Sequence, residues 1–358
     1  MRPILLNPGP VSLSEAVRKA AVSADLCHRE PEFFQLQAQL REGLLGVYGC
    51  DREDWAAVLL GGSGTTALEA MLATLPGRDA RMLVIENGVY GERIARIAEI
   101  HDIDFEALQF GWTEPIDFAR VEETLASGGF THLAAVHHET TTGRLNDVLR
   151  LTKLCEAHGL QLLLDAVSSF GAEAIPFESP ALVACAATAN KCLHGIPGLC
   201  FVVARRPALA SAAQPPRSLY LDLSLWLDKQ DQDSTPFTPP VNALLALDKA
   251  LEELRDHGGW QARHARYTKL AGRVRRALAA RGVETLLPGG ASSCVLVAYQ
   301  IPEGSTYAAI HDRLKQWGFV IYAGQGSLAA QLFRISTMGD ITDYDMERLL
   351  AAIESVFQ

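Results

Sequence analysis

Short apolar runs alternate with helical patterns between residues 56 and 204, and this alternation constrains the fold more than any other feature. Six runs are typical of buried strands: 56–60, 81–86, 131–137, 160–165, 182–187 and 199–204. Between several of them lie segments with helical periodicity: 65–75, 91–100, 116–126 and 147–159. Strands that alternate with helices of this length are joined by right-handed crossovers. The sequence therefore predicts an α/β fold whose mostly parallel sheet is covered by helices on both faces.

The pattern changes after about residue 205. A stretch rich in Pro, Ser and Asp spans 213–240, and a long helical segment starts near Val241. The C-terminal third then mixes strand and helix patterns, which predicts a smaller α+β domain. The extended segment LLNPGPV near the N-terminus does not suit a helix-covered sheet, so we expect it to cross to this domain. The predicted domains are 13–245, and 1–12 together with 246–358.

Composition excludes several classes of protein. Apolar residues make up 48% of the 358 residues, which is typical of a globular chain. A net charge of -10 offers no basic footprint for nucleic acid, although an anionic substrate still depends only on the local field. No apolar run approaches a membrane span, and the Pro- and Gly-containing start predicts no signal peptide. The seven cysteines form no CxxC pair, which predicts reduced thiols in a cytoplasmic protein with no metal site.

The segment GGSGTT at 61–66 follows a predicted strand and opens a predicted helix. Gly64 lets the backbone approach a ligand, and the helix N-terminus offers free N–H groups. Ser63, Thr65 and Thr66 add hydroxyl groups. The segment is a candidate phosphate cup, although a plain strand–helix turn has the same composition.

Two further candidates follow apolar strands. Asp165 ends the run LQLLLD, at the strand end where α/β sheets bind ligands. Lys191 comes 26 residues later and precedes a glycine-rich loop, where desolvation would lower its pKa and make its amine nucleophilic. Taken by itself, an aspartate such as Asp165 is more often a helix cap or an ion-pair partner. A single lysine such as Lys191 is more often a surface residue.

The three signals in this order suit pyridoxal 5′-phosphate. The cup would hold the phosphate, Asp165 would keep the pyridine nitrogen protonated, and Lys191 would bind the aldehyde covalently.

At this point the sequence resembles the class V, fold-type I pyridoxal-phosphate aminotransferases over essentially its whole length. The resemblance rests on motifs in the family's order: NPGP (7–10), GSGTTALEA (62–70), NGVYGER (87–93), HETTTG (138–143), DAVSSFGA (165–172), NKCLHGIPG (190–198) and FRISTMG (333–339). It implies a seven-stranded sheet and a homodimer with active sites at the interface. Within the family, HETTTG, DAVSSFG and FTPP are most similar to enzymes that transaminate 2-aminoethylphosphonate.

The resemblance also implies roles for single residues around the cofactor. Tyr90 would stack on the ring, and Thr141, either alone or together with Thr140, would contact its O3′ oxygen. Thr188 and Thr238 would bind the phosphate, Thr238 from the partner subunit. The alternatives are a core aromatic for Tyr90 and turn residues for Thr141 and Thr238.

For the substrate, the resemblance assigns Arg334 to the carboxylate, and a guanidinium suits a planar carboxylate well. The chain departs from the better-known aminoethylphosphonate enzymes in two places. It has HREPEF, in which His28 and Arg29 would supply positive charge or form loop ion pairs. It also has YAGQ, in which Gln325 replaces a lysine.

The implied activity is reversible transamination of 2-aminoethylphosphonate, an aminophosphonate, with the oxo acid pyruvate. The alternatives are an alanine–glyoxylate or serine–pyruvate aminotransferase, favoured by HREPEF, and a lyase acting on a substituted aminoethylphosphonate. A non-enzymatic regulatory domain is disfavoured by the set of Lys191, Asp165 and Arg334. His137 and His138 are adjacent on a predicted strand and point to opposite sides, so we expect no shared metal ion.

Overall fold

The computed structural model describes residues 2–212 and 214–357. Residue 213, at the start of the predicted Pro/Ser/Asp-rich stretch, and residues 1 and 358, at the ends of the predicted small domain, lie outside this range. The strands of the largest sheet are β2 (Trp55–Gly62), β3 (Arg81–Glu86), β4 (Asp104–Gln109), β5 (His132–Val136), β8 (Gln161–Asp165), β9 (Leu182–Thr188) and β10 (Gly198–Arg205).

Within the described residues this sheet has seven strands in the order β2-β10-β9-β8-β5-β3-β4. All neighbouring pairs are parallel except those that β10 makes with β2 and β9. The predicted mostly parallel sheet is therefore confirmed. The sequence analysis missed β4, an edge strand whose side chains are largely exposed and which is not an apolar run.

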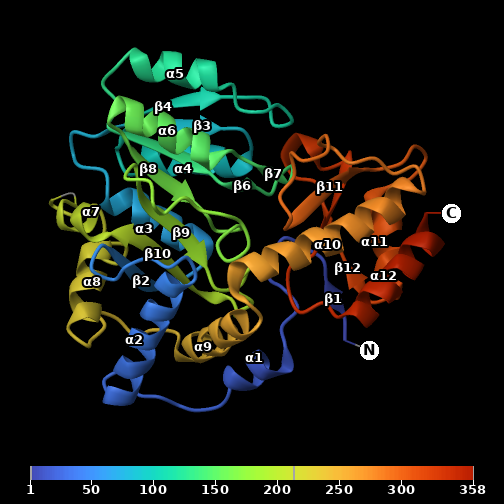
Figure 1. Ribbon diagram of the computed structural model, residues 1–358, viewed down its shortest axis with the longest axis horizontal. Helices are drawn as coiled ribbons and strands as arrows, with labels where there is room; N and C mark the ends of the chain where they lie inside the picture. Colours follow the sequence, from blue (N-terminus) through green and yellow to red (C-terminus); the bar gives the residue numbers. More distant parts are fainter. Residues whose placement is uncertain (1, 213, 358) are drawn as a thin grey trace.

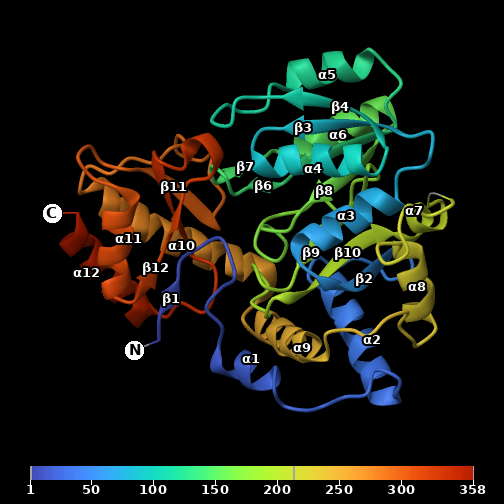
Figure 2. The same cartoon turned by 180° about the vertical axis from the view of Figure 1, so that it is seen from behind.

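Helices cover both faces of this sheet (Figures 1 and 2). The helices of this part of the chain are α2 (Pro31–Gly46), α3 (Gly64–Thr74), α4 (Val89–Ile100), α5 (Phe118–Ala126), α6 (Val148–His158), α7 (Arg206–Ala210), α8 (Leu223–Asp231) and α9 (Val241–Asp256). Because side chains alternate along a strand, each central strand feeds two cores. On β10, Phe201 and Val203 enter the core under α2, α6 and α9, whereas Cys200 and Val202 enter the core under α3, α4 and α8.

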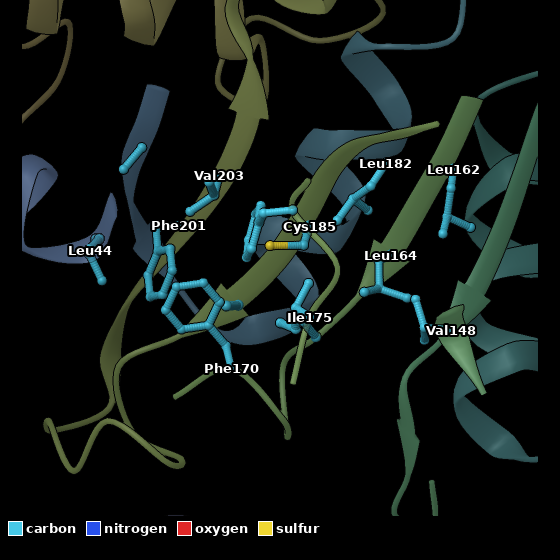
Figure 3. Packing of buried hydrophobic residues seen from close by; sticks show 14 of the residues in the cluster. Leu44, Val148, Leu162, Leu164, Phe170, Ile175, Leu182, Cys185, Phe201 and Val203 are labelled. Atoms are coloured by element: carbon cyan, nitrogen blue, oxygen red, sulfur yellow. The ribbon is translucent and has the colours of Figure 1, made fainter. Parts of the chain in front are cut away.

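Figure 3 shows the first of these cores from close by. Phe170 and Phe201 meet edge to face, with ring centroids 5.0 Å apart, beside Cys185 and Ile175. A fully buried Phe or Leu side chain contributes roughly 1.5–3 kcal/mol, so this layer is a main source of stability for the sheet. It also anchors the strand ends where Asp165 and Thr188 lie.

The C-terminal part forms a second, smaller unit of helices and short strands. Its elements are α10 (Gly259–Ala279), β11 (Leu296–Gln300), α11 (Tyr307–Gln316), β12 (Phe319–Val320), β13 (Tyr322–Ala323), a short 3₁₀ turn η1 (Gly326–Leu328), β14 (Leu332–Ser336) and α12 (Asp343–Val356). Strands β11, β14 and β13 form one antiparallel sheet. The boundary predicted at 245/246 falls inside α9, and the division of the chain into those two ranges stays a prediction.

The N-terminal segment contacts this smaller unit. Strand β1 (Ile4–Leu5) pairs in parallel with β12, and Ser12 bridges to Gly339. Helix α1 (Glu15–Ala20) then packs against α9. A two-stranded ribbon of β6 (His138–Glu139) and β7 (Arg144–Leu145) leaves the large sheet after β5. No helix among the described residues has the length and apolarity that crossing a lipid bilayer requires.

Candidate active site

Parallel strands β5, β8 and β9 end side by side at one edge of the large sheet, with Val136 opposite Asp165 and Asp165 opposite Ala186. Their carboxyl ends carry polar groups into the same region. Asp165 is the last residue of β8, Thr188 is the last of β9, and Lys191 follows three residues later. The predicted strand-end positions of Asp165 and Lys191 therefore bring the two side chains into one site.

Asp165 is a buried carboxylate with one oxygen in use. Its Oδ1 accepts the Val167 N–H at 2.9 Å, while no hydrogen bond from the described residues reaches Oδ2. Burial raises the pKa of Asp165 to about 6, and the Val167 N–H and the charges of Arg93 and Lys191 oppose that rise. At neutral pH the group is mainly ionised and has a free oxygen for a cationic partner.

Lys191 lies deep in the site. Burial lowers the pKa of its amine to about 8, and the nearby Arg334 and Arg93 act in the same direction. The negative charge of Asp165 opposes this lowering of the Lys191 pKa. An amine with this pKa is partly neutral at physiological pH, which nucleophilic or base chemistry requires.

The NPGP segment forms a wall against Lys191. The Lys191 Nζ donates a hydrogen bond to the Pro8 carbonyl oxygen. Gly9 has a φ of +113°, and a Cβ at this residue would lie 2.6 Å from the lysine Cδ. Only glycine suits both the backbone angle and this close approach. A segment that belongs to the smaller unit thus touches the central side chain of the larger one.

The glycine-rich turn lies against the loop that follows Asp165. Helix α3 begins at Gly64, where a Cβ would lie 2.5 Å from the Val167 Cγ1. The Ser63 N–H donates to Thr66 Oγ1 at 3.1 Å, so the first turn of the helix is closed locally. Arg93 Nη1 donates to Thr65 Oγ1 at 3.2 Å. The turn therefore combines helix N–H groups, hydroxyls and one arginine next to Asp165.

Glu139 is the residue that the sequence analysis missed. This fully buried carboxylate accepts the Thr141 hydroxyl at 2.6 Å and the Thr141 N–H at 3.0 Å on Oε1. Its Oε2 accepts the Tyr90 N–H at 3.1 Å. Burial raises the pKa of Glu139 above its usual value, and these hydrogen bonds limit the rise. One carboxylate thereby links the predicted ring-stacking residue to the predicted O3′ contact.

Tyr90 and its neighbour Arg93 lie on the first turns of α4. The Arg93 guanidinium carbon lies 4.6 Å from the centroid of the Tyr90 ring, in the range of a cation–π contact. The Val89 N–H donates to Thr141 Oγ1 at 3.3 Å. Hydrogen bonds therefore join the start of α4 to the turn at 139–143.

Arg334 is 2% exposed, yet it pairs with no carboxylate of the described residues. Its Nε donates to the Ala323 carbonyl at 2.8 Å, and its Nη1 donates to the Thr140 carbonyl at 2.7 Å and to Gln325 Oε1 at 2.9 Å. No hydrogen bond from those residues involves Nη2. A buried guanidinium that is held by neutral groups keeps its charge available for an anionic ligand.

His137 and His138 are two adjacent buried imidazoles at the end of β5 and the start of β6. Burial lowers the pKa of each imidazole to about 4, so both are neutral at physiological pH. His138 Nδ1 lies 3.2 Å from the Ser168 carbonyl oxygen, and its Nε2 is buried without a partner among the described residues. His138 also lies close enough to Lys191 for the amine to lower its pKa further.

Other predicted residues lie apart from this cluster in the single chain. Thr238 is exposed, and Arg29 Nη1 donates to the Thr235 carbonyl at 3.3 Å, so these two segments are neighbours. No hydrogen bond or ion pair within the described range joins His28, Arg29 or Thr238 to Lys191. Thr188 lies near Lys191, and its hydroxyl contacts Asn190 Oδ1 and the Leu199 carbonyl. The roles given to these four residues stay predictions.

The residues present fit pyridoxal 5′-phosphate. The free Oδ2 of buried Asp165 suits a protonated ring nitrogen, and the Lys191 amine has the lowered pKa that reaction with an aldehyde requires. The turn at 63–66 and Arg93 suit a phosphate, because N–H groups and a cation converge there.

The comparison with known families agrees with this fit. A family described as aminotransferase class-V matches residues 18–340. The chain belongs to the class-V aminotransferases, which are pyridoxal-phosphate enzymes with the fold-type I architecture.

Two relatives and one solved structure show which members of the family this chain is similar to. A 2-aminoethylphosphonate–pyruvate transaminase of Phocaeicola vulgatus is 34% identical over 362 residues, with 99% of each chain covered. One from Aeromonas hydrophila is 38% identical over 360 residues, covering 98% of this chain and 94% of the relative. Among solved structures, an aspartate aminotransferase of subgroup IV from Thermus thermophilus has a TM-score of 0.90 at 28% identity, with 99% of both chains covered.

Proposed function

We propose that this aminotransferase converts 2-aminoethylphosphonate and pyruvate into phosphonoacetaldehyde and alanine. The observation that carries the proposal is the buried Arg334 guanidinium, which faces no carboxylate of the described residues. Its positive charge is near enough to Lys191 to lower the pKa of the amine. Both substrates bring an anionic group into such a site. The full-length relatives named for this reaction support the choice of substrate.

The side chains have distinct tasks. Bound pyridoxal phosphate supplies an electron sink and carries the amino group between the two substrates. Asp165 presents its free oxygen to the ring nitrogen and keeps that nitrogen protonated. The neutral Lys191 Nζ takes the proton from the substrate carbon and returns it as general acid. Arg334 holds the anionic end of the substrate, which fixes the distance between that end and the lysine.

We also propose a homodimer in which the partner subunit completes each site, in a cytoplasmic protein. Thr238 is exposed, and no hydrogen bond among the described residues involves its side chain; the neighbouring loop at 28–29 carries positive charge. Exposed polar groups of this kind could bind a phosphate or phosphonate that occupies the active site of the partner subunit. Thr238 is the candidate phosphate ligand, and His28 and Arg29 are candidates for the substrate anion.

A single half-reaction tests the substrate. The purified yellow enzyme is mixed with 2-aminoethylphosphonate, alanine or serine in the absence of any oxo acid, and the visible absorption of the bound cofactor is followed. We expect 2-aminoethylphosphonate to bleach the band and pyruvate to restore it. Lys191→Ala is the control that should not respond.

The other outcomes separate the alternatives. Bleaching by alanine and serine alone would reject the phosphonate substrate and leave an alanine–glyoxylate or serine–pyruvate aminotransferase. Release of ammonia from a substituted aminoethylphosphonate without any oxo acid would instead identify a lyase.

A further inference from the structure

A second cluster of reactive side chains lies where the two units meet, outside the site described above. It consists of Glu173, after the loop that follows β8, His264 on α10, and Cys294, just before β11. Glu173 is buried, and the residues His264 and Cys294 are partly buried. One ligand atom from each residue lies within 4.8 Å of the other two. The three residues offer a carboxylate oxygen, an imidazole nitrogen and a sulfur.

The separations match those around a tetrahedral zinc ion. His264 Nδ1 lies 3.2 Å from Glu173 Oε2 and 3.5 Å from Cys294 Sγ. Zinc binds N and O at about 2.0–2.2 Å and S at about 2.3 Å, so tetrahedral ligands lie about 3.3 Å (N to O) and about 3.6 Å (N to S) apart. A carboxylate oxygen of Glu173 and Cys294 Sγ lie within 4.8 Å of each other. The Ala172 carbonyl oxygen lies 2.9 Å from the same His264 nitrogen, so it has to turn away or become a ligand when an ion binds.

The carboxylate is already held in place for this task. Glu173 Oε1 accepts the Ser293 hydroxyl at 2.5 Å and the Cys294 N–H at 2.9 Å, whereas Oε2 lies 3.2 Å from His264 Nδ1. Although burial acts to raise it, these hydrogen bonds hold the pKa of Glu173 below its usual value, so the group is ionised. An ionised, buried carboxylate whose Oε1 is fixed by hydrogen bonds can present Oε2 to a cation beside His264.

We propose that Glu173, His264 and Cys294 form a binding site for a divalent ion of the zinc class, with water as the fourth ligand. The thiol, with its pKa raised by burial, is protonated in the metal-free protein. The His264 Nδ1 shares its proton with the Ala172 carbonyl oxygen, 2.9 Å away. Binding releases the thiol proton and transfers the imidazole proton to Nε2, so affinity rises with pH.

The site would tie the two units together beside the cofactor site. Glu173 follows the motif DAVSSFGA that carries Asp165, and the Ser293 N–H donates to the Gly143 carbonyl at 2.9 Å, at the end of the turn that contains Glu139 and Thr141. A metal here restrains movement of the smaller unit against the larger one. We therefore expect bound zinc to slow turnover and to raise the temperature of unfolding.

Equilibrium dialysis of the holoenzyme against Zn²⁺ tests the proposal, with Cys294→Ser and His264→Gln as variants. Cys27→Ser is the matched control, because Cys27 is an exposed thiol far from the cluster in sequence. We expect one zinc equivalent to be bound by the wild type and by the control, and to be lost in both cluster variants. Equal zinc binding by all four proteins, or none by the wild type, overturns the proposal.

Co²⁺ supplies a second readout that does not depend on activity. A sulfur-to-cobalt absorption band in the difference spectrum between the wild type and Cys294→Ser would place the ion on this thiol. Both variants remove partly exposed groups, and thermal unfolding without metal checks that they fold. A band of unchanged intensity in Cys294→Ser would contradict the assignment.

Discussion

At the scale of single residues, the environment of Lys191 leads to a pH prediction. Its pKa of about 8 means that the neutral fraction of the amine grows as pH rises through 8, whereas an ordinary lysine titrates near 10.4. We expect the rate at which apoenzyme captures pyridoxal phosphate to increase with pH and to level off above about pH 8. Stopped-flow absorbance at several pH values measures this rate.

Arg93 supplies an internal check on this prediction. Its charge acts to lower the Lys191 pKa, so Arg93→Gln should shift the midpoint to higher pH. A wild-type rate that is still increasing at about pH 10 would show that the amine is not shifted at all.

Glu139 gives the second prediction at this scale. Glu139→Gln keeps the shape of the side chain but removes the charge that holds Thr141 and the Tyr90 backbone. A hydrogen bond to a charged group contributes about 1.5–3 kcal/mol, so we expect cofactor affinity to fall about 10- to 100-fold. Dialysis into cofactor-free buffer, followed by fluorescence titration, measures the change. Glu122→Gln, on the exposed face of α5, should bind as the wild type does.

The sequence pointed most directly to candidate site residues that lie at or just after the end of a predicted strand. Asp165 and Lys191 were singled out because an apolar run points to the strand end, and Arg334 because the FRIS motif resembles that of the family. Glu139 was missed because HETTTG was interpreted through its hydroxyls. The contact of Gly9 with Lys191 and the cluster of Glu173, His264 and Cys294 join residues far apart in the chain, and no spacing in a single sequence indicates such pairs.

At the scale of elements, the prediction succeeded for buried strands and failed for an exposed one. Strands β8, β9 and β10 are covered on both faces and form continuous apolar runs. Strand β4 lies at the edge of the sheet, where charged side chains alternate with partly buried ones. Its pairing with β3 holds it as a strand, and its own composition gives only a weak strand signal.

Two glycines in helices lead to opposite predictions for the same substitution. In α4, a Cβ on Gly91 would lie 2.7 Å from the Ile85 carbonyl oxygen, so Gly91→Ala should force the helix off β3 and destabilise the protein by roughly 1–3 kcal/mol. In α2, a Cβ on Gly46 would meet nothing within 4 Å. Gly46→Ala should be neutral or stabilising by about 0.5–1 kcal/mol. Urea unfolding measures both, and equal effects would contradict the packing described for α4.

At the scale of the whole molecule, complementation tests whether the sites are shared. Lys191→Ala removes the amine, and Thr238→Asp sets a negative charge against the cofactor phosphate. Each variant alone should be nearly inactive. If Thr238 acts on the partner's site, mixing after subunit exchange should restore about a quarter of wild-type turnover, because half of the dimers are hybrids with one intact site each. No recovery would show that Thr238 acts within its own chain or has no such role.

Because β1 pairs with β12, the fold around β1 cannot be completed during synthesis until β12 has been made. Ile4 leaves the ribosome before its partner Phe319, which emerges more than three hundred residues later. Until then the large sheet can fold around Lys191 while the Pro8–Gly9 wall is still unattached. The growing chain therefore carries an uncovered Lys191 from the time this residue emerges until β12 appears and pairs with β1.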